Sequence, residues 1–418
     1  MSGLQPSGLG RSGSFGASDH EKLFTDRQAD RIGYICPGHD VQTRLNELIA
    51  DPAISMIVLT DEFAVDGGIT IDTGLDPSGN GMRKYVITGL GSGGIENDTS
   101  GPILEIDVTD GPFYSCNVRD MKLSGGTTDQ GLLFSEDSGN NAVNQCSFDN
   151  LVIGGGIGNA PQGNGFEMTT KMYESTFANC RIVGAGNHGW YLVPPSDEGI
   201  SQMYFERCKS QRATNAGMFV GPVSKSTFVG CEMNDSGGRG WQVAGGNYPA
   251  MFIGCDAEGN TGDGWRVASG GKTFSQCGAG HNAIGMNVKG SYNIIEGGRF
   301  ESPDADGLRL DGSFNEYRGS KIMYDNVTLA GATDLNWKAQ GKTFNQAAAT
   351  DRNDSGKITI SFDTPFTSPP ILTFARRGDG INGINYTTNG AGEYDGATVS
   401  ISTAGGTIDW NAAPQELV

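Results

Sequence analysis

The sequence predicts an all-β protein built around a parallel β-helix. A Phe-x-x-Cys motif recurs along the chain, a Gly-Φ-x-Φ motif (Φ is apolar) recurs in phase with it, and 66 of the 418 residues are glycine. Both motifs return about every 23 residues, and a fixed period of this length is typical of a solenoid. The segments between glycines are short and rich in β-branched and aromatic residues, which favours strands over helices. Each coil would hold three short strands, paired with their equivalents in neighbouring coils.

The two motifs predict ladders of identical side chains inside the stack. Phe-x-x-Cys occurs at Phe113–Cys116, Phe177–Cys180, Phe205–Cys208, Phe228–Cys231, Phe252–Cys255 and Phe274–Cys277, with Val143–Cys146 as a weaker copy. Gly-Φ-x-Φ begins at Gly165, Gly189, Gly217, Gly240, Gly264, Gly285 and Gly307. We predict that the cysteines are reduced and structural, because free cysteine packs as a small apolar residue.

The ends of the chain differ from the repeat. Asp40 can cap a short helix over residues 40–50, which would cover the open edge of the first coil. Towards the C-terminus the strands alternate with turns at regular intervals, which indicates a small β-sandwich. The predicted organisation is an N-terminal arm at 1–35, a shaft at 36–337, a linker at 338–355 and a sandwich at 356–418.

The excess of acidic over basic residues limits the kinds of molecule that the protein can bind. The chain carries 29 Lys and Arg against 48 Asp and Glu, a net charge of −19, so nucleic acid is an unsuitable partner. No apolar run is long enough to span a membrane, and the first residues do not have the basic and apolar regions of a secretory signal. Two interpretations of the acidic excess stay open: solubility through self-repulsion, or a native environment of high salt.

One outward column of side chains is a candidate ligand surface. If both Φ residues of each Gly-Φ-x-Φ strand face inward, the residue between them faces outward. In coil order this column is Leu133, Glu167, Tyr191, Phe219, Gln242, Arg266, Asn287 and Arg309. Two aromatic rings followed by amide and guanidinium groups suit saccharide recognition. The alternative is that Tyr191 and Phe219 pack against a neighbouring subunit or a long loop.

Carboxylate pairs are the only candidates for catalysis. Glycoside hydrolysis uses two carboxyl groups about 5 Å apart for retention or about 6.5–9.5 Å apart for inversion. Asp263 and Asp306 precede the glycine of strands two coils apart, and Glu232 and Asp256 follow cysteines of adjacent coils. In an acidic chain such pairs also arise as turn residues or surface charges. The sequence therefore neither supports nor excludes an enzyme.

The sequence gives little reason to expect a cofactor. His39, His188 and His281 lie far apart in the repeat, so we predict no transition-metal site. The acidic turn Asp72–Asp76 is a candidate for a structural Ca²⁺ ion, although it does not match an EF-hand loop.

The repeat resembles a known superfamily. Residues 35–335, with their helix, strand and glycine-rich entry at 40–71, resemble the pectin-lyase-like right-handed parallel β-helix proteins, and among these the tailspike and tail-fibre proteins of tailed viruses. The stretches Ile360–Leu372 and Ile408–Ala412 are similar to H-type lectin-like domains of viral fibres. The resemblance implies a homotrimer that is attached through its N-terminus to other tail or baseplate proteins of a virion. It also implies that the shaft or tip binds a host surface glycan.

Three functions follow from these observations. The first is a viral tail spike or fibre that attaches the virion to a host glycan or glycoprotein, made in the host cytoplasm without a signal peptide. The second is a polysaccharide depolymerase, a glycoside hydrolase or lyase, of the same fold. The third is a structural decoration protein of the virion.

Overall fold

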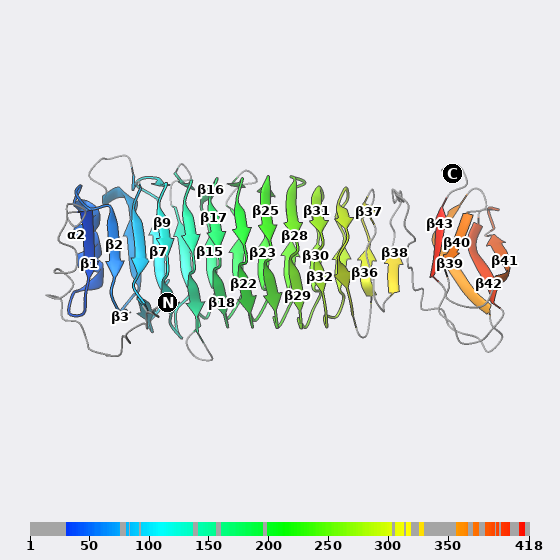
Figure 1. Ribbon diagram of the computed structural model, residues 1–418, viewed down its shortest axis with the longest axis horizontal. Coiled ribbons are helices and arrows are strands. Elements are labelled where there is room, and N and C mark those ends of the chain that lie inside the picture. Colours follow the sequence, from blue (N-terminus) through cyan, green and yellow to red (C-terminus); the bar gives the residue numbers. More distant parts are fainter. Residues whose placement is uncertain are drawn as a thin grey trace, which may run out of the picture.

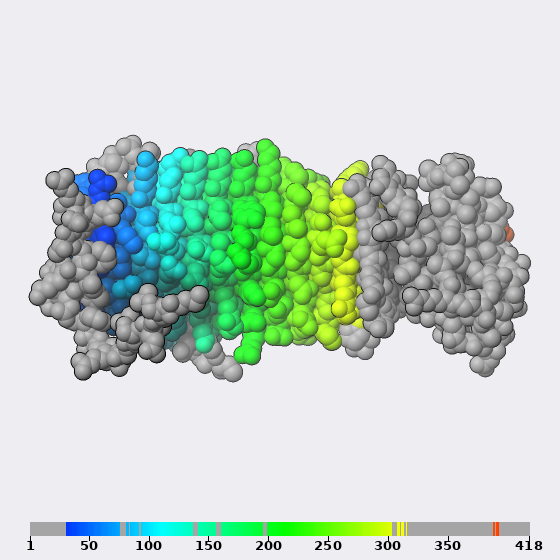
Figure 2. Space-filling model, in the orientation of Figure 1, coloured from blue at the N-terminus to red at the C-terminus, as the bar shows by residue number. Residues whose placement is uncertain are grey.

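The protein is a right-handed parallel β-helix, as the repeat predicts. In the computed structural model the coils follow one another along the long axis (Figure 1), and in the space-filling view they appear as successive colour bands (Figure 2). The structure describes residues 31–75, 81–82, 84–91, 93–136, 141–155, 160–194, 199–302, 306–312, 315–318, 326–329, 357–366, 371–375, 381–388, 390–392, 394–401 and 409–413.

Each full coil gives one strand to each of three faces, and each face is a parallel sheet. The twelve-stranded sheet contains β1 (Ile32–Ile35), β2 (Met56–Leu59), β5 (Val86–Gly89), β9 (Asn117–Arg119), β13 (Ser147–Asp149), β17 (Thr176–Ala178), β21 (Tyr204–Glu206), β25 (Ser226–Val229), β28 (Ala250–Ile253), β31 (Lys272–Ser275), β34 (Ile294–Glu296) and β37 (Glu316–Arg318). The eleven-stranded sheet contains β4 (Ile69–Asp72), β7 (Leu104–Asp107), β11 (Leu132–Ser135), β15 (Phe166–Met168), β19 (Trp190–Leu192), β23 (Met218–Val220), β27 (Trp241–Val243), β30 (Trp265–Val267), β33 (Met286–Val288), β36 (Asp306–Leu310) and β38 (Asn326–Leu329). The eight-stranded sheet contains β3 (Glu62–Val65), β6 (Gly94–Asn97), β10 (Lys122–Ser124), β14 (Val152–Gly154), β18 (Arg181–Val183), β22 (Lys209–Gln211), β26 (Glu232–Asn234) and β29 (Asp256–Glu258).

Shorter sheets complete the described strands. A five-stranded parallel sheet forms a fourth side of some coils, and a two-stranded parallel sheet belongs to later coils. They contain β8 (Phe113–Tyr114), β12 (Ala142–Asn144), β16 (Lys171–Tyr173), β20 (Ile200–Ser201) and β24 (Val223–Ser224), and β32 (Gly278–Ala279) and β35 (Arg299–Phe300), respectively.

The C-terminal strands pair antiparallel in two sheets, in agreement with the predicted all-β C-terminal unit. One sheet is three-stranded and the other is two-stranded. They contain β39 (Lys357–Phe366), β42 (Tyr394–Ile401) and β41 (Ile381–Thr388), and β40 (Ile371–Ala375) and β43 (Asp409–Ala413), respectively. The lectin-like character of this unit stays a prediction.

The core consists of the predicted ladders. Five successive pairs of phenylalanine rings, from Phe148 to Phe274, stack with centroids 4.6 to 5.0 Å apart. Trp241 and Trp265 stack in parallel at 4.7 Å on the facing side, and both meet the phenylalanine ladder edge-on. Aromatic rings in these geometries stabilise a core beyond the area they bury. The ladders therefore join consecutive coils from Phe148 to Phe274.

The cysteines form a buried ladder next to the rings. All eight are free, and the thiols of Cys231 and Cys255 lie 3.6 and 3.4 Å from the carbonyl oxygens of Phe205 and Phe228 in the preceding coils. Burial raises the pKa of the Cys208 thiol, so it stays protonated and can donate. The structure thus gives the cysteines the packing role that the sequence predicts.

Buried amides form a further ladder at one turn, which the sequence analysis did not identify. Asn260 Nδ2 donates to Asn282 Oδ1 at 2.9 Å, and Asn282 Nδ2 donates to the carbonyl of Ala257 at 2.8 Å. At another turn the buried Lys272 ammonium donates to the carbonyls of Gly246, Tyr248 and Gly270. These side chains satisfy backbone groups where the coil leaves its sheet.

The N-terminal end is covered by α2 (Val41–Ala50), in agreement with the predicted helix. Asp40 Oδ1 accepts a hydrogen bond from the Thr43 backbone N–H at 2.7 Å, as an N-cap residue should. One boundary was wrong. β1 lies within the predicted arm 1–35 but pairs in parallel with β2, so the stack already includes Ile32–Ile35. A Cβ at Gly33 would lie 2.3 Å from Leu48 Cδ2, so a larger residue there would displace the Leu48 side chain of α2.

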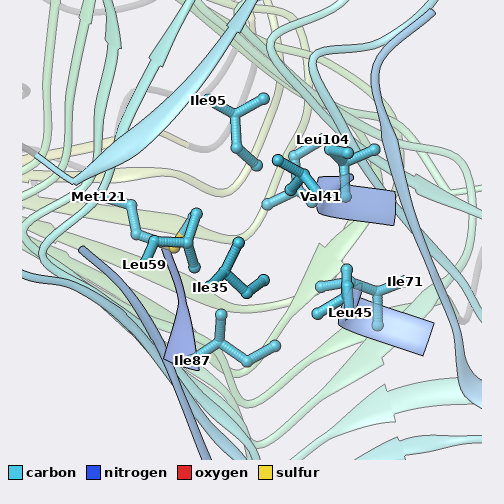
Figure 3. A pocket seen from close by; sticks show the side chains of 10 residues that line it. Ile35, Val41, Leu45, Leu59, Ile71, Ile87, Ile95, Leu104 and Met121 are labelled. Atoms are coloured by element: carbon cyan, nitrogen blue, oxygen red, sulfur yellow. The ribbon is translucent and has the colours of Figure 1, made fainter. Parts of the chain in front are cut away.

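A small apolar void remains beneath α2. It has a volume of about 10 Å³, and Val41 and Leu45 of the helix face Ile35, Ile71 and other aliphatic side chains across it (Figure 3). A void of this size and polarity stays dry, because a water molecule there would have no polar partner.

Several predictions concern residues that the structure does not describe. Residues 1–30 of the predicted arm (1–35) and the whole predicted linker (338–355) lie outside the described residues. Among the described residues, no helix is long and apolar enough to cross a membrane.

The ladder can be tested with Phe228→Ala. Phe228 is fully buried and stacks between Phe205 and Phe252 at 4.7 Å on both sides, so the variant should lose about 3–5 kcal/mol of unfolding free energy. Urea unfolding followed by tryptophan fluorescence measures this loss. Ser147→Ala, on the outward side of the strand that carries Phe148 of the same ladder, is the control and should change stability by less than about 0.5 kcal/mol. Equal effects of both variants would contradict the ladder as the source of stability.

Candidate functional site

The predicted outward column exists, and it runs along the outer face of the eleven-stranded sheet. Strand register pairs each member with the next, in the predicted order: Leu133, Glu167, Tyr191, Phe219, Gln242, Arg266, Asn287 and Arg309. The flanking Φ residues are buried, so the alternation of each strand points the column outward. Most members are half-buried, but Asn287 is only 6% exposed, contrary to the expectation of a fully outward side chain.

Two aromatic members of the column lie together with a third aromatic side chain from the turn before it. The rings of Tyr191 and Phe219 lie 5.4 Å apart, and His188 lies 5.4 Å from each of them. His188 Nδ1 accepts a hydrogen bond from the Ala216 backbone N–H at 3.2 Å. Burial is the main cause that lowers the pKa of His188, so the imidazole is neutral at pH 7. The result is an uncharged aromatic platform across two coils.

Polar side chains continue the column beyond this platform. Gln242 accepts a hydrogen bond from Arg239 at 3.0 Å, and the Asn287 amide donates to Asp263 at 3.2 Å. Arg309 donates to Asp311 at 3.1 Å. On the other side of the platform, Glu167 accepts a hydrogen bond from Asn164 at 2.9 Å.

A second column of residues supports the outward column, and it was not predicted from the sequence. Its members precede the outward residues by three positions in each coil: Asn164, His188, Ala216, Arg239, Asp263, Ile284 and Asp306. Asn164 and Arg239 form a hydrogen bond with the outward residue of their own coil, and Asp263 forms one with that of the next coil. The constant offset of three residues before the Gly-Φ-x-Φ outward position was the signal that could have identified these residues.

The first carboxylate pair is not assembled as a catalytic pair in the described residues. Asp263 Oδ2 is occupied by the Asn287 amide, and Ile284 holds the equivalent position in the coil between Asp263 and Asp306. Asp306 lies in β36, where its backbone pairs with Asn326, and its side chain lies outside the described residues. The predicted spacing of two coils is confirmed for the backbone only.

The second pair is adjacent, and it lies on a different face. Glu232 and Asp256 are register partners on the eight-stranded sheet. Glu232 forms an ion pair with Lys209 at 2.8 Å, whereas burial, followed by Glu258 and Glu232, raises the pKa of Asp256 against the opposing hydrogen bond from Ala257. Glu232 thus contacts a cation, whereas Asp256 retains its proton to higher pH, and a carboxyl group with a raised pKa is what general acid catalysis requires.

The described residues contain no cluster of three His, Cys, Asp or Glu side chains that could hold a metal ion. In the candidate calcium turn, Asp72 Oδ1 accepts a hydrogen bond from the Gly74 N–H at 2.8 Å, and Asp76 lies outside the described residues. The calcium site stays a prediction.

Solved structures of similar fold have low sequence identity to this chain. The A-module of a mannuronan C-5 epimerase from Azotobacter vinelandii has a TM-score of 0.49 and 11% identity, over 71% of this chain and 96% of that one. The enzymatically active domain of tailspike protein 2 of bacteriophage CBA120 has a TM-score of 0.46 and 10% identity, over 93% and 71%. The Dettilon tailspike protein has a TM-score of 0.43 and 11% identity, over 96% and 94%.

These likenesses concern the fold alone. No known protein family matches the sequence, and no curated protein matches it either.

The raised pKa of Asp256 predicts a pH-dependent gain in stability from Asp256→Asn. The folded protein binds the proton more tightly than the unfolded chain, whose carboxyl has a pKa of 3.8, so the carboxylate costs stability above the folded pKa. The variant should therefore unfold at a higher temperature at pH 7, and the gain should disappear as the pH falls below 3.8. Calorimetry at both pH values measures it.

Glu96→Gln, an outward carboxylate on β6 of the same sheet, is the control. A lower unfolding temperature of Asp256→Asn at pH 7 would show that the Asp256 carboxylate is stabilising and would contradict the prediction.

Proposed function

We propose that the protein is a virion attachment protein of the tailspike or tail-fibre kind, which binds a host surface glycan along the outward column of the eleven-stranded sheet. The observation that carries this proposal is the platform of His188, Tyr191 and Phe219, continued by hydrogen-bonding groups on successive coils. Aromatic rings bind the apolar faces of sugars, and amide and guanidinium groups bind hydroxyl and carboxylate oxygens.

The spacing of the column supports an extended ligand. Successive members lie one coil apart, about 4.8 Å along the axis. This rise is close to the length of one pyranose unit, so a polysaccharide parallel to the shaft can present one sugar to each coil. A single small ligand would use only one or two coils, whereas the column extends without interruption from Glu167 to Arg309.

Assembly uses another face in this proposal. On β25, β28 and β31 of the twelve-stranded sheet, the six outward side chains are uncharged: Thr227, Val229, Met251, Ile253, Thr273 and Ser275. Met251 is 44% exposed, and Tyr204 continues this surface at 38%. Copies of a chain with a net charge of −19 repel each other least where they carry no carboxylates. We therefore assign the homotrimer contact to this face, which leaves the aromatic platform open to a ligand.

The remaining parts of the proposal follow the sequence resemblance. The N-terminal arm attaches to other tail or baseplate proteins, the C-terminal sheets form a lectin-like tip, and the acidic surface suits either solubility or high salt. The protein would then reside on the virion after synthesis in the host cytoplasm.

Replacing both Tyr191 and Phe219 by alanine should abolish glycan binding and leave the oligomer intact. Glycan binding is measured on immobilised bacterial surface polysaccharides. The oligomer is measured by sedimentation, which should give three times the monomer mass. Tyr173→Ala, an outward tyrosine on β16, is the control and should bind as the wild type does. A double variant that dissociates into monomers would instead assign the platform to the subunit interface.

A polysaccharide depolymerase is the second candidate, because Glu232 and Asp256 combine adjacency with opposite electrostatic surroundings. In this candidate Asp256 protonates the leaving oxygen and Glu232 acts as the second carboxylate. Wild-type protein should then release reducing ends from a bound polysaccharide, and Glu232→Gln and Asp256→Asn should each release none. Binding without release by the wild type would exclude this candidate and leave attachment as the function.

A further inference from the structure

Beyond the aromatic platform, the surface of the eleven-stranded sheet carries positively charged side chains, and these bear on the charge of the ligand. Although the chain is strongly acidic, the coils of β27 and β30 present two guanidinium groups, Arg239 and Arg266, on the face of the eleven-stranded sheet. Arg266 follows Gln242 in the outward column, and Arg239 lies in the supporting column beside Gln242.

Neither guanidinium group forms an ion pair within the described part of the chain. Arg239 donates to the uncharged Gln242 amide, and Arg266 makes no side-chain hydrogen bond or ion pair with a described residue. The nearby carboxylate of Asp263 is bonded to the Asn287 amide. The next cations along the face, Lys289 and Arg309, both contact Asp311. The single carboxylate of Asp263 therefore offsets the positive charge of Arg239 and Arg266 only in part.

The positive charges of the two arginines also repel each other. Burial lowers the pKa of Arg239, the neighbouring charge of Arg266 lowers it further, and Asp263 only partly opposes them. Two like charges held close on a half-buried surface cost free energy in the absence of a counter-ion. A bound anion would remove this cost, and the planar guanidinium fork matches a carboxylate or a similar oxyanion.

We propose that the glycan is acidic, and that Arg239 and Arg266 bind a negatively charged group carried by one of its sugars. The inference rests on the proposed glycan-binding function. Arg266 lies two coils from Phe219, about 10 Å along the axis, so a chain stacked on the platform brings its second following sugar to the guanidinium groups. A neutral polysaccharide would leave both charges unpaired while desolvating them.

The test uses an array of bacterial surface polysaccharides, each carboxylate-bearing polymer being present in native form and after chemical reduction of its carboxyl groups to alcohols. Reduction keeps the sugar backbone and removes only the charge. Sulfated polysaccharides on the same array distinguish a sulfate from a carboxylate as the source of the anion. Wild-type protein and Arg266→Gln are compared in low and high salt.

Wild-type protein should bind native acidic polymers and lose binding to their reduced forms. Arg266→Gln should bind the native polymer about 10- to 100-fold more weakly, the loss expected for one hydrogen bond to a charged group. It should also show a weaker dependence on salt, whereas Arg266→Lys should keep that dependence. Arg181→Gln, an exposed arginine on the eight-stranded sheet, is the matched control and should bind as the wild type does.

The outcomes separate the inference from the function on which it rests. Binding of neutral or reduced polymers as tightly as native ones, with Arg266→Gln unaffected, would overturn the acidic ligand and leave glycan attachment standing. Failure of the wild type to bind any polysaccharide would overturn the proposed function and the inference together. Unchanged thermal unfolding of Arg266→Gln would show that weaker binding does not come from loss of the fold.

Discussion

Parallel, in-register hydrogen bonding between consecutive coils is the constraint on which the whole structure depends. Because each strand pairs with its equivalent one coil away, any side chain at a given position lies directly above the same position of the preceding coil. This arrangement favours a core in which many side chains stack on their own kind. Phenylalanine, tryptophan, cysteine and asparagine all do so here, and a one-residue slip would move each ladder to the surface.

The same constraint explains how much of the fold could be predicted from the sequence. The period and the Phe-x-x-Cys and Gly-Φ-x-Φ motifs are local patterns, so they predict the coils, the ladders and even the order of the outward column. The start of the stack could not be predicted in this way, because β1 precedes the first recognisable repeat and is held by pairing with β2 and by the contact of Gly33 with Leu48. Such contacts depend on tertiary packing and leave no periodic signal.

In the candidate site too, some residues could be predicted from the sequence and others could not. The outward column could be predicted from alternation alone, whereas the role of His188 could not, since its contacts to Tyr191 and Phe219 cross from a turn to two different strands. Asn287 illustrates the opposite error. Alternation points it outward, but its amide turns to Asp263 and the side chain becomes buried. Turn conformation, which determines where these supporting residues lie, is not encoded in a two-residue alternation.

The helix α2 has a consequence for the lifetime of the folded protein. In a stack where each coil contacts only its neighbours, an interior coil cannot leave before one of them, so the chain unravels from its ends. At the N-terminal end the first barrier is removal of α2, with Val41, Leu45, Leu48 and Ile49 buried against the stack. The helix therefore slows unfolding from the N-terminal end. Where no chaperone can refold the chain, the lifetime of the folded protein depends on that rate more than on equilibrium stability.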